Sequence, residues 1–445
     1  MTKIVLVLLF LFTLPWDSSP QWIRSDVGDA GSELNCTLVG TGRDDGVVRV
    51  YGGDWIGNVH EMTWNGITWD HDTLFVGATE IHNMGMGPGR NDGITRIYAG
   101  SLDFGMYELT YSGGWLIQDI ALTGGVKYHA VVGNGRNDGV NRVYVGSASR
   151  VYEYTYNSGV WDTVNLGQRT NGMHGLSLGS GRNDGINRIY VANLNDTLYE
   201  FSFNGVTWIS SVVGTAGNDF RNVTVGQGRN DGVQRVYGAS IDGSVHEFSW
   251  NGIGWDFSDL GVTPTQQVNV IIRDARNDGV ERVYAAGGDG SIYEFSYGGG
   301  LWNQMNLGSG GAYMYGLSIG EGRNDGLLRV YGGNFDFHIW EFSYAGVGFE
   351  ERESEISQKT LNLLPFYPNP TSGRTTFPFT LSLPEEVILT LYNRAGQKVS
   401  TIWKGRLDVG DHFLQWDVNP CPMGVYLVRF QGIKNETFEK LIVIH

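Results

Sequence analysis

The sequence predicts an all-β protein, a seven-bladed β-propeller of four-stranded blades followed by a small immunoglobulin-like β-sandwich. The string Gly-Arg-Asn-Asp-Gly occurs seven times at spacings of 46 or 47 residues, with Asp44 and Ala275 as its two variations. Each repeat holds four short runs rich in β-branched and aromatic residues, separated by glycine-rich turns, which is typical of a four-stranded meander. Sheets of this kind bury both faces when they are arranged radially, so seven of them form a propeller.

The composition supports this prediction and excludes other classes. The chain has 445 residues with 66 glycines and 13% aromatic residues, which favours strands and tight turns over collagen or disorder. The formal net charge is −16, and an acidic surface repels phosphate backbones, so no nucleic acid partner is expected. Cys36 and Cys421 are too few for a disulfide framework and too far apart for a metal knuckle.

The domain boundaries follow from shifts in pattern along the chain. Residues 1–19 combine Lys3, an apolar run at 4–14 and a polar end, which predicts a secretory signal peptide and no transmembrane segment. The repeats assign residues 20–349 to the propeller. A glutamate-rich stretch, 350–364, is expected to be a linker, and residues 365–445 form the C-terminal domain.

The two ends of the repeat array indicate how the ring closes. Tryptophans recur at the start of the outermost strands, and Trp22 begins this series before the first complete repeat, while Phe349 stands at its end. Eight candidate outer strands are thus available for seven blades. Because the segment around Phe349 is strongly charged, we expect the Trp22 strand to complete the seventh blade and remove a free sheet edge.

The C-terminal segment has a different pattern, with alternating strands such as 387–392 and 424–429 and turns at 393–396 and 409–411. This pattern predicts a small antiparallel sandwich. Its motifs are Tyr-Pro-Asn-Pro at 367–370, Leu-Tyr-Asn-Arg-Ala-Gly at 391–396, Gly-Val-Tyr at 424–426 and Lys-Leu-Ile-Val at 440–443. In this order they resemble the C-terminal sorting domain of the type IX secretion system. The resemblance implies secretion to the medium or outer-membrane surface of a Gram-negative bacterium, with the type IX machinery as a partner of residues 365–445.

The charged residues of the repeated turn form the most regular motif in the chain. We interpret them as a structural repeat signature, because a single active site needs asymmetry whereas seven equal copies suit turn caps and ion pairs. A second arginine follows the first by six residues, and a glutamate recurs in the third strand. Calcium binding is the alternative, although one carboxylate per turn is few for that cation. The first arginine and the turn aspartate of the seven copies are Arg43 and Asp45, Arg90 and Asp92, Arg136 and Asp138, Arg182 and Asp184, Arg229 and Asp231, Arg276 and Asp278, and Arg323 and Asp325.

A ligand site is expected where the repeats differ. The most variable positions lie at the start of the innermost strands and in the loops between the second and third strands, which should rim one mouth of the central channel. We expect their side chains to be open to a ligand, so that replacing His174 or Arg221 affects binding rather than stability. The predicted ligand-binding residues are Asn35, His82, Tyr128, His129, His174, Arg221, Tyr315, Trp55 and Phe104. Three histidines on consecutive blades leave a metal as an alternative, but neither a metal nor a cofactor is predicted.

Three functions of different classes fit these features. The rhythm of Asp-Gly turns, aromatic hairpins and tryptophan strands loosely resembles lectin propellers, which implies a secreted protein that binds glycans with aromatic faces and polar side chains. The second possibility is a protein-interaction or adhesion scaffold. The third is a polysaccharide lyase or hydrolase with its site at the channel mouth. No catalytic residue is assigned, because the sequence has no nucleophile elbow, zincin helix or phosphate-binding loop.

Overall fold

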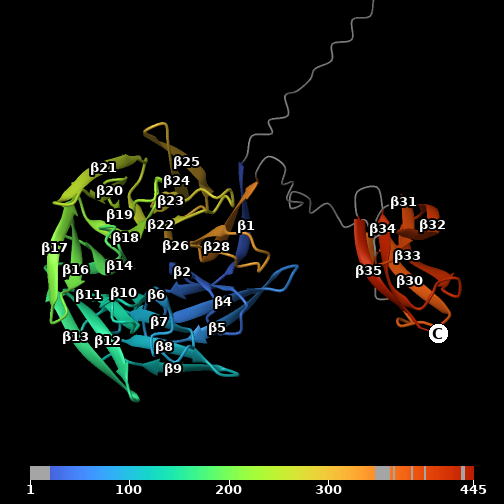
Figure 1. The fold of residues 1–445 in the computed structure, drawn as a ribbon, viewed down its shortest axis with the longest axis horizontal. Coiled ribbons are helices and arrows are strands. Elements are labelled where there is room, and N and C mark those ends of the chain that lie inside the picture. Colours follow the sequence, from blue (N-terminus) through green and yellow to red (C-terminus); the bar gives the residue numbers. More distant parts are fainter. Residues whose placement is uncertain are drawn as a thin grey trace, which may run out of the picture. The chain divides into compact units, whose positions relative to one another are not determined.

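The computed structural model describes residues 21–345, 361–363, 366–381, 384–394, 397–431 and 436–444. The chain divides into two compact units, residues 1–349 and 350–445. The first unit contains seven four-stranded antiparallel sheets arranged around a central axis, so the predicted seven-bladed propeller is confirmed (Figure 1). The predicted signal peptide lies outside the described residues.

Blades 1 to 6 each run from the innermost to the outermost strand in chain order. Blades 1 to 3 consist of β2 (Leu34–Gly40), β3 (Arg49–Asp54), β4 (Asn58–Trp64) and β5 (Trp69–Phe75); β6 (Ile81–Gly87), β7 (Arg96–Ser101), β8 (Met106–Tyr111) and β9 (Trp115–Asp119); and β10 (Lys127–Gly133), β11 (Arg142–Ser147), β12 (Arg150–Asn157) and β13 (Val160–Gln168). Blades 4 to 6 consist of β14 (Met173–Gly179), β15 (Arg188–Asn193), β16 (Thr197–Phe203) and β17 (Trp208–Thr215); β18 (Phe220–Gly226), β19 (Arg235–Ser240), β20 (Ser244–Trp250) and β21 (Trp255–Val262); and β22 (Gln267–Arg273), β23 (Arg282–Gly287), β24 (Ser291–Gly298) and β25 (Leu301–Ser309).

Blade 7 is built from both ends of the propeller. It consists of β26 (Met314–Gly320), β27 (Arg329–Asn334), β28 (His338–Ala345) and, as its outermost strand, β1 (Gln21–Asp29). Strand β1 pairs antiparallel with β28, and Trp22 lies opposite Tyr344. The predicted closure by the Trp22 strand is therefore confirmed, while Phe349 lies outside the described residues. Pairing of the two ends removes the free edge that an open ring would expose.

The blades pack through one aromatic contact that is repeated at every junction. The tyrosine of each second strand is fully buried and meets the outer-strand tryptophan of the following blade edge-to-face, with ring centroids 5.8–6.4 Å apart. Such pairs contribute about 0.5–1.5 kcal/mol beyond the buried area. The pairs are Tyr51 with Trp115, Tyr98 with Trp161, Tyr144 with Trp208, Tyr190 with Trp255, Tyr237 with Trp302, Tyr284 with Trp22 and Tyr331 with Trp69.

The second unit is a β-sandwich with its own core. One sheet holds β29 (Leu361–Leu363), β30 (Arg374–Leu381) and β33 (Gly410–Asp417), and the other holds β32 (Lys398–Leu407), β31 (Glu385–Tyr392), β34 (Gly424–Gln431) and β35 (Glu436–Val443). Strand β29 falls inside the stretch predicted as a linker, whose remaining residues lie outside the described part of the chain. The side chain of Asn369 accepts a hydrogen bond from Ile442 N and donates one to Lys440 O, so the Tyr-Pro-Asn-Pro motif holds the terminal strand.

Two terms describe the propeller below. The entry face is the end at which the innermost strands begin, and the turn face is the end that carries the Gly-Arg-Asn-Asp-Gly turns. Across the described ranges of the chain, no helix is long and apolar enough to cross a membrane.

Candidate functional site

The turn aspartate of each repeat is held by the second arginine of the same repeat. In blade 4, Arg188 donates to both oxygens of Asp184, at 2.8 Å from Nη1 and 2.6 Å from Nη2. The backbone N–H of Ile186 donates to the same carboxylate at 3.1 Å, which caps the turn. These hydrogen bonds, above all those from Arg188, lower the pKa of Asp184 to about 2. The same ion pair occurs in all seven blades.

The repeated glutamate is a buried acceptor shared by two arginines. Glu200 is 1% exposed and accepts hydrogen bonds from Arg182 Nε at 2.9 Å and from Arg182 Nη2 at 2.6 Å. Arg188 Nε lies 3.7 Å from the same carboxylate, and the hydroxyl of Tyr190 donates to it at 3.1 Å. A buried carboxylate is tolerated only when its charge is compensated in this way. The signature residues are thus engaged within the blade.

The first arginine of each repeat also contacts the next blade. Its guanidinium lies over an aromatic ring of the following blade, with Cζ 4.0–4.7 Å from the ring centroid. The seven rings all stand three residues after the repeated glutamate, so their positions can be recognised from the sequence. The pairs are Arg43 with Tyr111, Arg90 with Tyr156, Arg136 with Phe203, Arg182 with Trp250, Arg229 with Tyr297, Arg276 with Tyr344 and Arg323 with Trp64.

The asparagine of the turn forms a second link between neighbouring blades. In blade 4, Asn183 Nδ2 donates to Gln234 O at 2.9 Å, and Gln234 N donates to Asn183 Oδ1 at 2.6 Å. The asparagine has φ near +60°, a conformation that asparagine tolerates better than most residues. In blade 1 the residue is Asp44, which accepts from Thr95 N at 3.3 Å but has no N–H to donate. The other pairs are Asn91 with Asn141, Asn137 with Asn187, Asn230 with Glu281, Asn277 with Leu328 and Asn324 with Val48.

These contacts argue against calcium binding by the repeated turns. Both carboxylate oxygens of a turn aspartate already accept from an arginine, whose positive charge opposes a cation. Within the residues that the structure describes, no group of three or more His, Cys, Asp or Glu side chains is arranged to hold a metal ion.

The variable positions of the channel mouth share one backbone feature. In every blade the register between the innermost and second strands shifts by one residue. The residue of the innermost strand at which the shift occurs is the one that varies most between the repeats. A β-bulge changes the direction of a side chain. The seven bulge residues are Asn35, His82, Tyr128, His174, Arg221, Val268 and Tyr315.

Four of the bulge side chains meet across the axis and form what we call the aromatic plug: His82, Tyr128, His174 and Tyr315. The rings of Tyr128 and His174 stack at 4.3 Å, and His82 lies 4.9 Å from each of them and 6.1 Å from Tyr315. His82 and His174 are each only 8% exposed, so the expectation of open side chains is wrong for these two histidines, whereas Tyr128 and Tyr315 are half-buried. The bulges turn them into the channel, where they fill space.

The other predicted mouth residues occupy different places. His129 lies one residue beyond its bulge and faces the channel below the plug. Asn35 is buried and accepts a hydrogen bond from the indole N–H of Trp55 at 2.5 Å. Phe104 is exposed on a separate loop of blade 2.

Burial sets the electrostatics of the plug. Burial lowers the pKa of His82 to about 4 and that of His174 well below its usual value, and the positive charge of Arg221 adds to both effects. Burial raises the pKa of Glu80, which lies 4.0 Å from His82 Nε2, to about 7. The histidines of the plug are therefore neutral near pH 7.

An aromatic surface remains accessible on the entry face at blades 7 and 1. Trp55 packs against Phe335 with ring centroids 5.6 Å apart, and Phe335 stacks on Tyr313 at 5.2 Å. Trp55 is 44% exposed and Phe337, two residues beyond Phe335, is 41% exposed. We define the aromatic surface as Trp55, Tyr313, Phe335 and Phe337. Trp55, Phe335 and Phe337 come from the loops between second and third strands, where the sequence predicts the mouth, whereas Tyr313 was not predicted.

Two phenylalanines in the loops between second and third strands, one in blade 7 and one in blade 2, have an unfavourable backbone conformation. Phe337 and Phe104 have φ of 75° and 77°, while three other blades place glycine at the same loop position, among them Gly290 with φ of 82°. A bulky residue in the left-handed region is strained, and strain of this kind gathers at functional sites. The loops thus keep large exposed rings where the fold favours glycine.

Comparisons with known proteins agree with the two units. Residues 365–444 match the family model of the secretion system C-terminal sorting domain. This confirms the predicted sorting tail, so the protein is exported by type IX secretion to the outside or surface of a Gram-negative bacterium. The chain is similar to the crystal structure of the WD40 β-propeller domain of Doa1, with a TM-score of 0.53 and 12% identity over 72% of this chain and 95% of that one. At this identity the likeness concerns the fold alone. No curated protein sequence matches the chain.

Proposed function

We propose that the propeller is a secreted carbohydrate-binding protein and that its ligand packs on the aromatic surface of the entry face. The observation that carries the proposal is the contact chain from Trp55 through Phe335 to Tyr313, with the exposed ring of Phe337 in the same loop as Phe335. Sugar rings present apolar C–H faces that suit exposed aromatic rings, and contiguous exposed apolar groups mark ligand sites on soluble proteins.

Polar groups beside the rings are suited to sugar hydroxyls. Asp336 stands between Phe335 and Phe337, is exposed, and its carboxylate has no hydrogen-bond partner among the described residues. A free carboxylate accepts from hydroxyl groups without a need for cations. The signature residues contribute nothing comparable, because their carboxylates and guanidinium groups are engaged within and between blades.

The distribution of these rings predicts one site rather than seven. The seven blades share the locking contacts, whereas the aromatic surface is confined to blades 7 and 1. We therefore expect a stoichiometry of one glycan segment per chain, whereas seven equal clefts between blades would bind a glycan multivalently.

A glycan array probed with the chain lacking residues 1–19 tests the proposal. We expect binding to a restricted set of glycans, reduced at least tenfold in Trp55→Ala. The matched control is Phe257→Ala, which removes an exposed aromatic ring from the outer strand of blade 5. Equal binding by both variants, or no binding to any glycan, would contradict the proposal, and cleavage of a bound polysaccharide would identify an enzyme.

A protein-interaction or adhesion scaffold is the second candidate, and one observation favours it. The outer hairpins carry strongly exposed aliphatic side chains at equivalent tips on the turn face. They are Ile67, Val160, Val206, Ile253 and Leu301. If the scaffold function is correct, replacing Ile67, Val206 and Ile253 by serine abolishes attachment to a protein-coated surface, while Trp55→Ala has no effect on it.

A further inference from the structure

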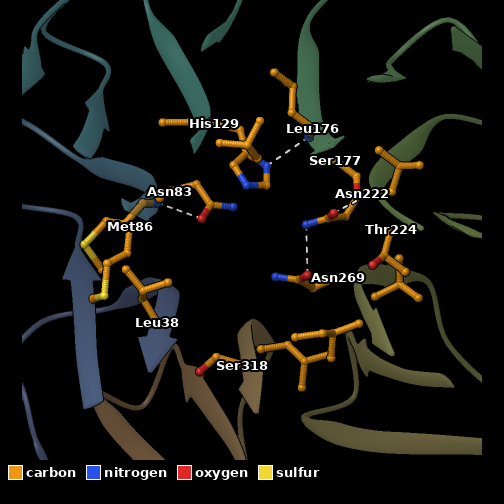
Figure 2. Close-up of a pocket in the computed structure, with 18 of the residues that line it drawn as sticks. Leu38, Asn83, Met86, His129, Leu176, Ser177, Asn222, Thr224, Asn269 and Ser318 are labelled. Carbon is orange, nitrogen blue, oxygen red and sulfur yellow. Dashed lines mark hydrogen bonds between the residues drawn. The ribbon is translucent and has the colours of Figure 1, made fainter. Parts of the chain in front are cut away.

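The central channel contains a cavity of about 360 Å³ that lies below the aromatic plug. It is lined by residues of all seven innermost strands, β2, β6, β10, β14, β18, β22 and β26 (Figure 2). On the entry side the plug closes the channel, because rings from blades 2, 3, 4 and 7 contact one another across the axis. The cavity therefore lies between the aromatic plug and the turn face.

The closed end of the cavity carries a layer of neutral polar side chains. Asn83, His129, Asn222 and Asn269 each follow a bulge residue by one position and point into the channel (Figure 2). Asn222 Nδ2 donates to Asn269 Oδ1 at 2.8 Å, which fixes the orientation of both amides. Among the lining residues, all of which the structure describes, there is no Asp, Glu, Lys or Arg.

Hydrogen bonds to the backbone leave two donors free in this layer. His129 Nδ1 accepts from Leu176 N at 3.0 Å, so the proton of the neutral ring is on Nε2. Asn83 Oδ1 accepts from Met84 N at 2.7 Å, so the amide group of Asn83 has its N–H bonds available. Burial lowers the pKa of His129 to about 3, so the ring stays neutral and its Nε2 remains a donor across the physiological range. Two neighbouring neutral donors are complementary to an oxygen acceptor.

The side nearer the turn face is mainly apolar. Leu38, Met86, Val131 and Ile271 line it, with the hydroxyl groups of Ser177 and Thr224 between them. Apolar walls with a few fixed polar groups are typical of small-molecule sites, and a volume of this size is at the lower end of the range that such sites cover.

We propose that this cavity is a second binding site, for an uncharged small molecule about the size of one hexose ring that presents an oxygen acceptor to His129 and Asn83. The site is independent of the entry-face function, since it lies beyond the aromatic plug and shares no residue with the aromatic surface. Charged ligands are disfavoured, because the lining offers no counter-charge and burial of an unpaired charge is costly.

Three matched probes test the proposal on the chain lacking residues 1–19. These are N-acetylglucosamine, which is neutral and carries an amide carbonyl, glucosamine, which is cationic, and glucuronate, which is anionic. Calorimetric titration in the Trp55→Ala background, in which entry-face binding should be at least tenfold weaker, should give one site for N-acetylglucosamine. The two charged sugars should bind at least tenfold more weakly. Equal binding of all three would overturn the proposal.

Two cavity variants and a crystal soak complete the test. Asn83→Leu removes a donor and Ser177→Phe fills the cavity, and each should reduce binding of N-acetylglucosamine at least tenfold while the protein keeps its cooperative melting. If either variant does not fold, the location of the sugar in a soaked crystal of the unsubstituted protein decides. Density for the sugar beside His129 and Asn83 supports the site, and density for ordered water alone or for a sugar elsewhere contradicts it.

Discussion

At the scale of single residues, the asparagine of the repeated turn makes a testable contribution to the junctions between blades. Blade 1 carries Asp44, which can accept from Thr95 N but cannot donate to Thr95 O as the asparagines of the other blades do to their partners. Asp44→Asn should restore this hydrogen bond and raise the free energy of unfolding by about 0.5–1.5 kcal/mol. Thermal melting measures the gain.

The reciprocal substitution Asn183→Asp is the control for this prediction. It removes the donor of an existing pair in blade 4 and should lower the melting temperature by a similar amount. If neither variant shifts the melting temperature, the side-chain amide adds nothing to the stability of the ring.

Replacing Phe337 should have opposite effects on the stability of the propeller and on glycan binding. Its φ of 75° costs about 1–3 kcal/mol for a bulky residue, whereas glycine adopts this conformation freely, as Gly290 does in blade 6. Phe337→Gly removes the backbone strain, but it also loses the partly buried area of the ring and gives the unfolded chain more conformational entropy. We expect the relief of strain to be larger, so the melting temperature should rise. Glycan binding should weaken at least tenfold. Melting curves and array binding, with Phe257→Ala as the binding control, test both parts. A variant that is less stable but binds fully would show that the ring serves the fold.

At this scale, contacts between residues that recur in every repeat could be predicted from the sequence. Contacts between residues that differ from blade to blade could not. The spacing of arginine, aspartate and glutamate identified the residues that form the repeated network. The partner ring three residues after each glutamate is equally regular, so this contact is also predictable from the sequence. The burial of His174 could not be read from the sequence, because it depends on rings from other blades that meet across the axis.

At the scale of secondary-structure elements, closure of the ring depends on β1. This strand pairs with β28 from Gln21 to Asp29, and Trp22 contacts Tyr284 of blade 6. Deleting residues 21–27 should expose the edge of β28 and remove one of the seven interblade aromatic pairs, so we expect a lower melting temperature and aggregation. Calorimetry and light scattering provide the measurement.

Truncation after residue 349 is the control for the β1 deletion, since it removes only the second compact unit. The propeller transition of the truncated chain should stay where it is in the longer protein. An unchanged melting curve for the β1 deletion would mean that another segment fills the outer position of blade 7.

The strand positions were predictable because turns and tryptophans recur with a fixed period. The bulge in each innermost strand was not, although it lies at the most variable position of every repeat. One inserted residue changes which side chains face the channel, and no residue type marks this shift reliably. The ligand-binding role of the mouth residues therefore stays a prediction, while the burial of His82 and His174 differs from what the sequence led us to expect.

At the scale of the whole molecule, sevenfold repetition and local asymmetry have different roles. The ion pairs, the amide links and the tryptophan contacts occur around the ring and hold it together. The aromatic surface, the plug and the cavity depend on residues that differ from blade to blade. The repeated contacts between blades make the propeller rigid, so a few positions can vary without loss of the fold. We look for function at these variable positions.

The buried histidines of the channel predict how the stability of the propeller depends on pH. Burial lowers the pKa of His82 to about 4, that of His129 to about 3 and that of His174 well below 6.5, whereas the unfolded chain protonates all three near 6.5. Between pH 6.5 and 4 the unfolded state therefore binds more protons, and stability falls as the pH falls. Glu80 acts in the opposite direction. Burial raises its pKa to about 7, so as the pH falls the folded state takes up this proton before the unfolded state does, which offsets the proton taken up by one histidine of the unfolded chain.

We expect the melting temperature to decrease steadily from pH 7 to pH 4, with each histidine contributing at most about 1.4 kcal/mol per pH unit. Below pH 4 the turn aspartates add to the loss, since Asp92, Asp138, Asp184 and Asp231 have pKa values of about 2. His174→Phe keeps a ring for stacking on Tyr128 and removes one of the histidines that the unfolded chain protonates. The melting temperature of this variant should therefore fall less steeply between pH 6.5 and 4.5. His412→Asn, in the C-terminal unit, should leave the propeller transition unchanged. A melting temperature that is constant from pH 7 to pH 4.5 would show that the plug opens to water when its histidines take up protons.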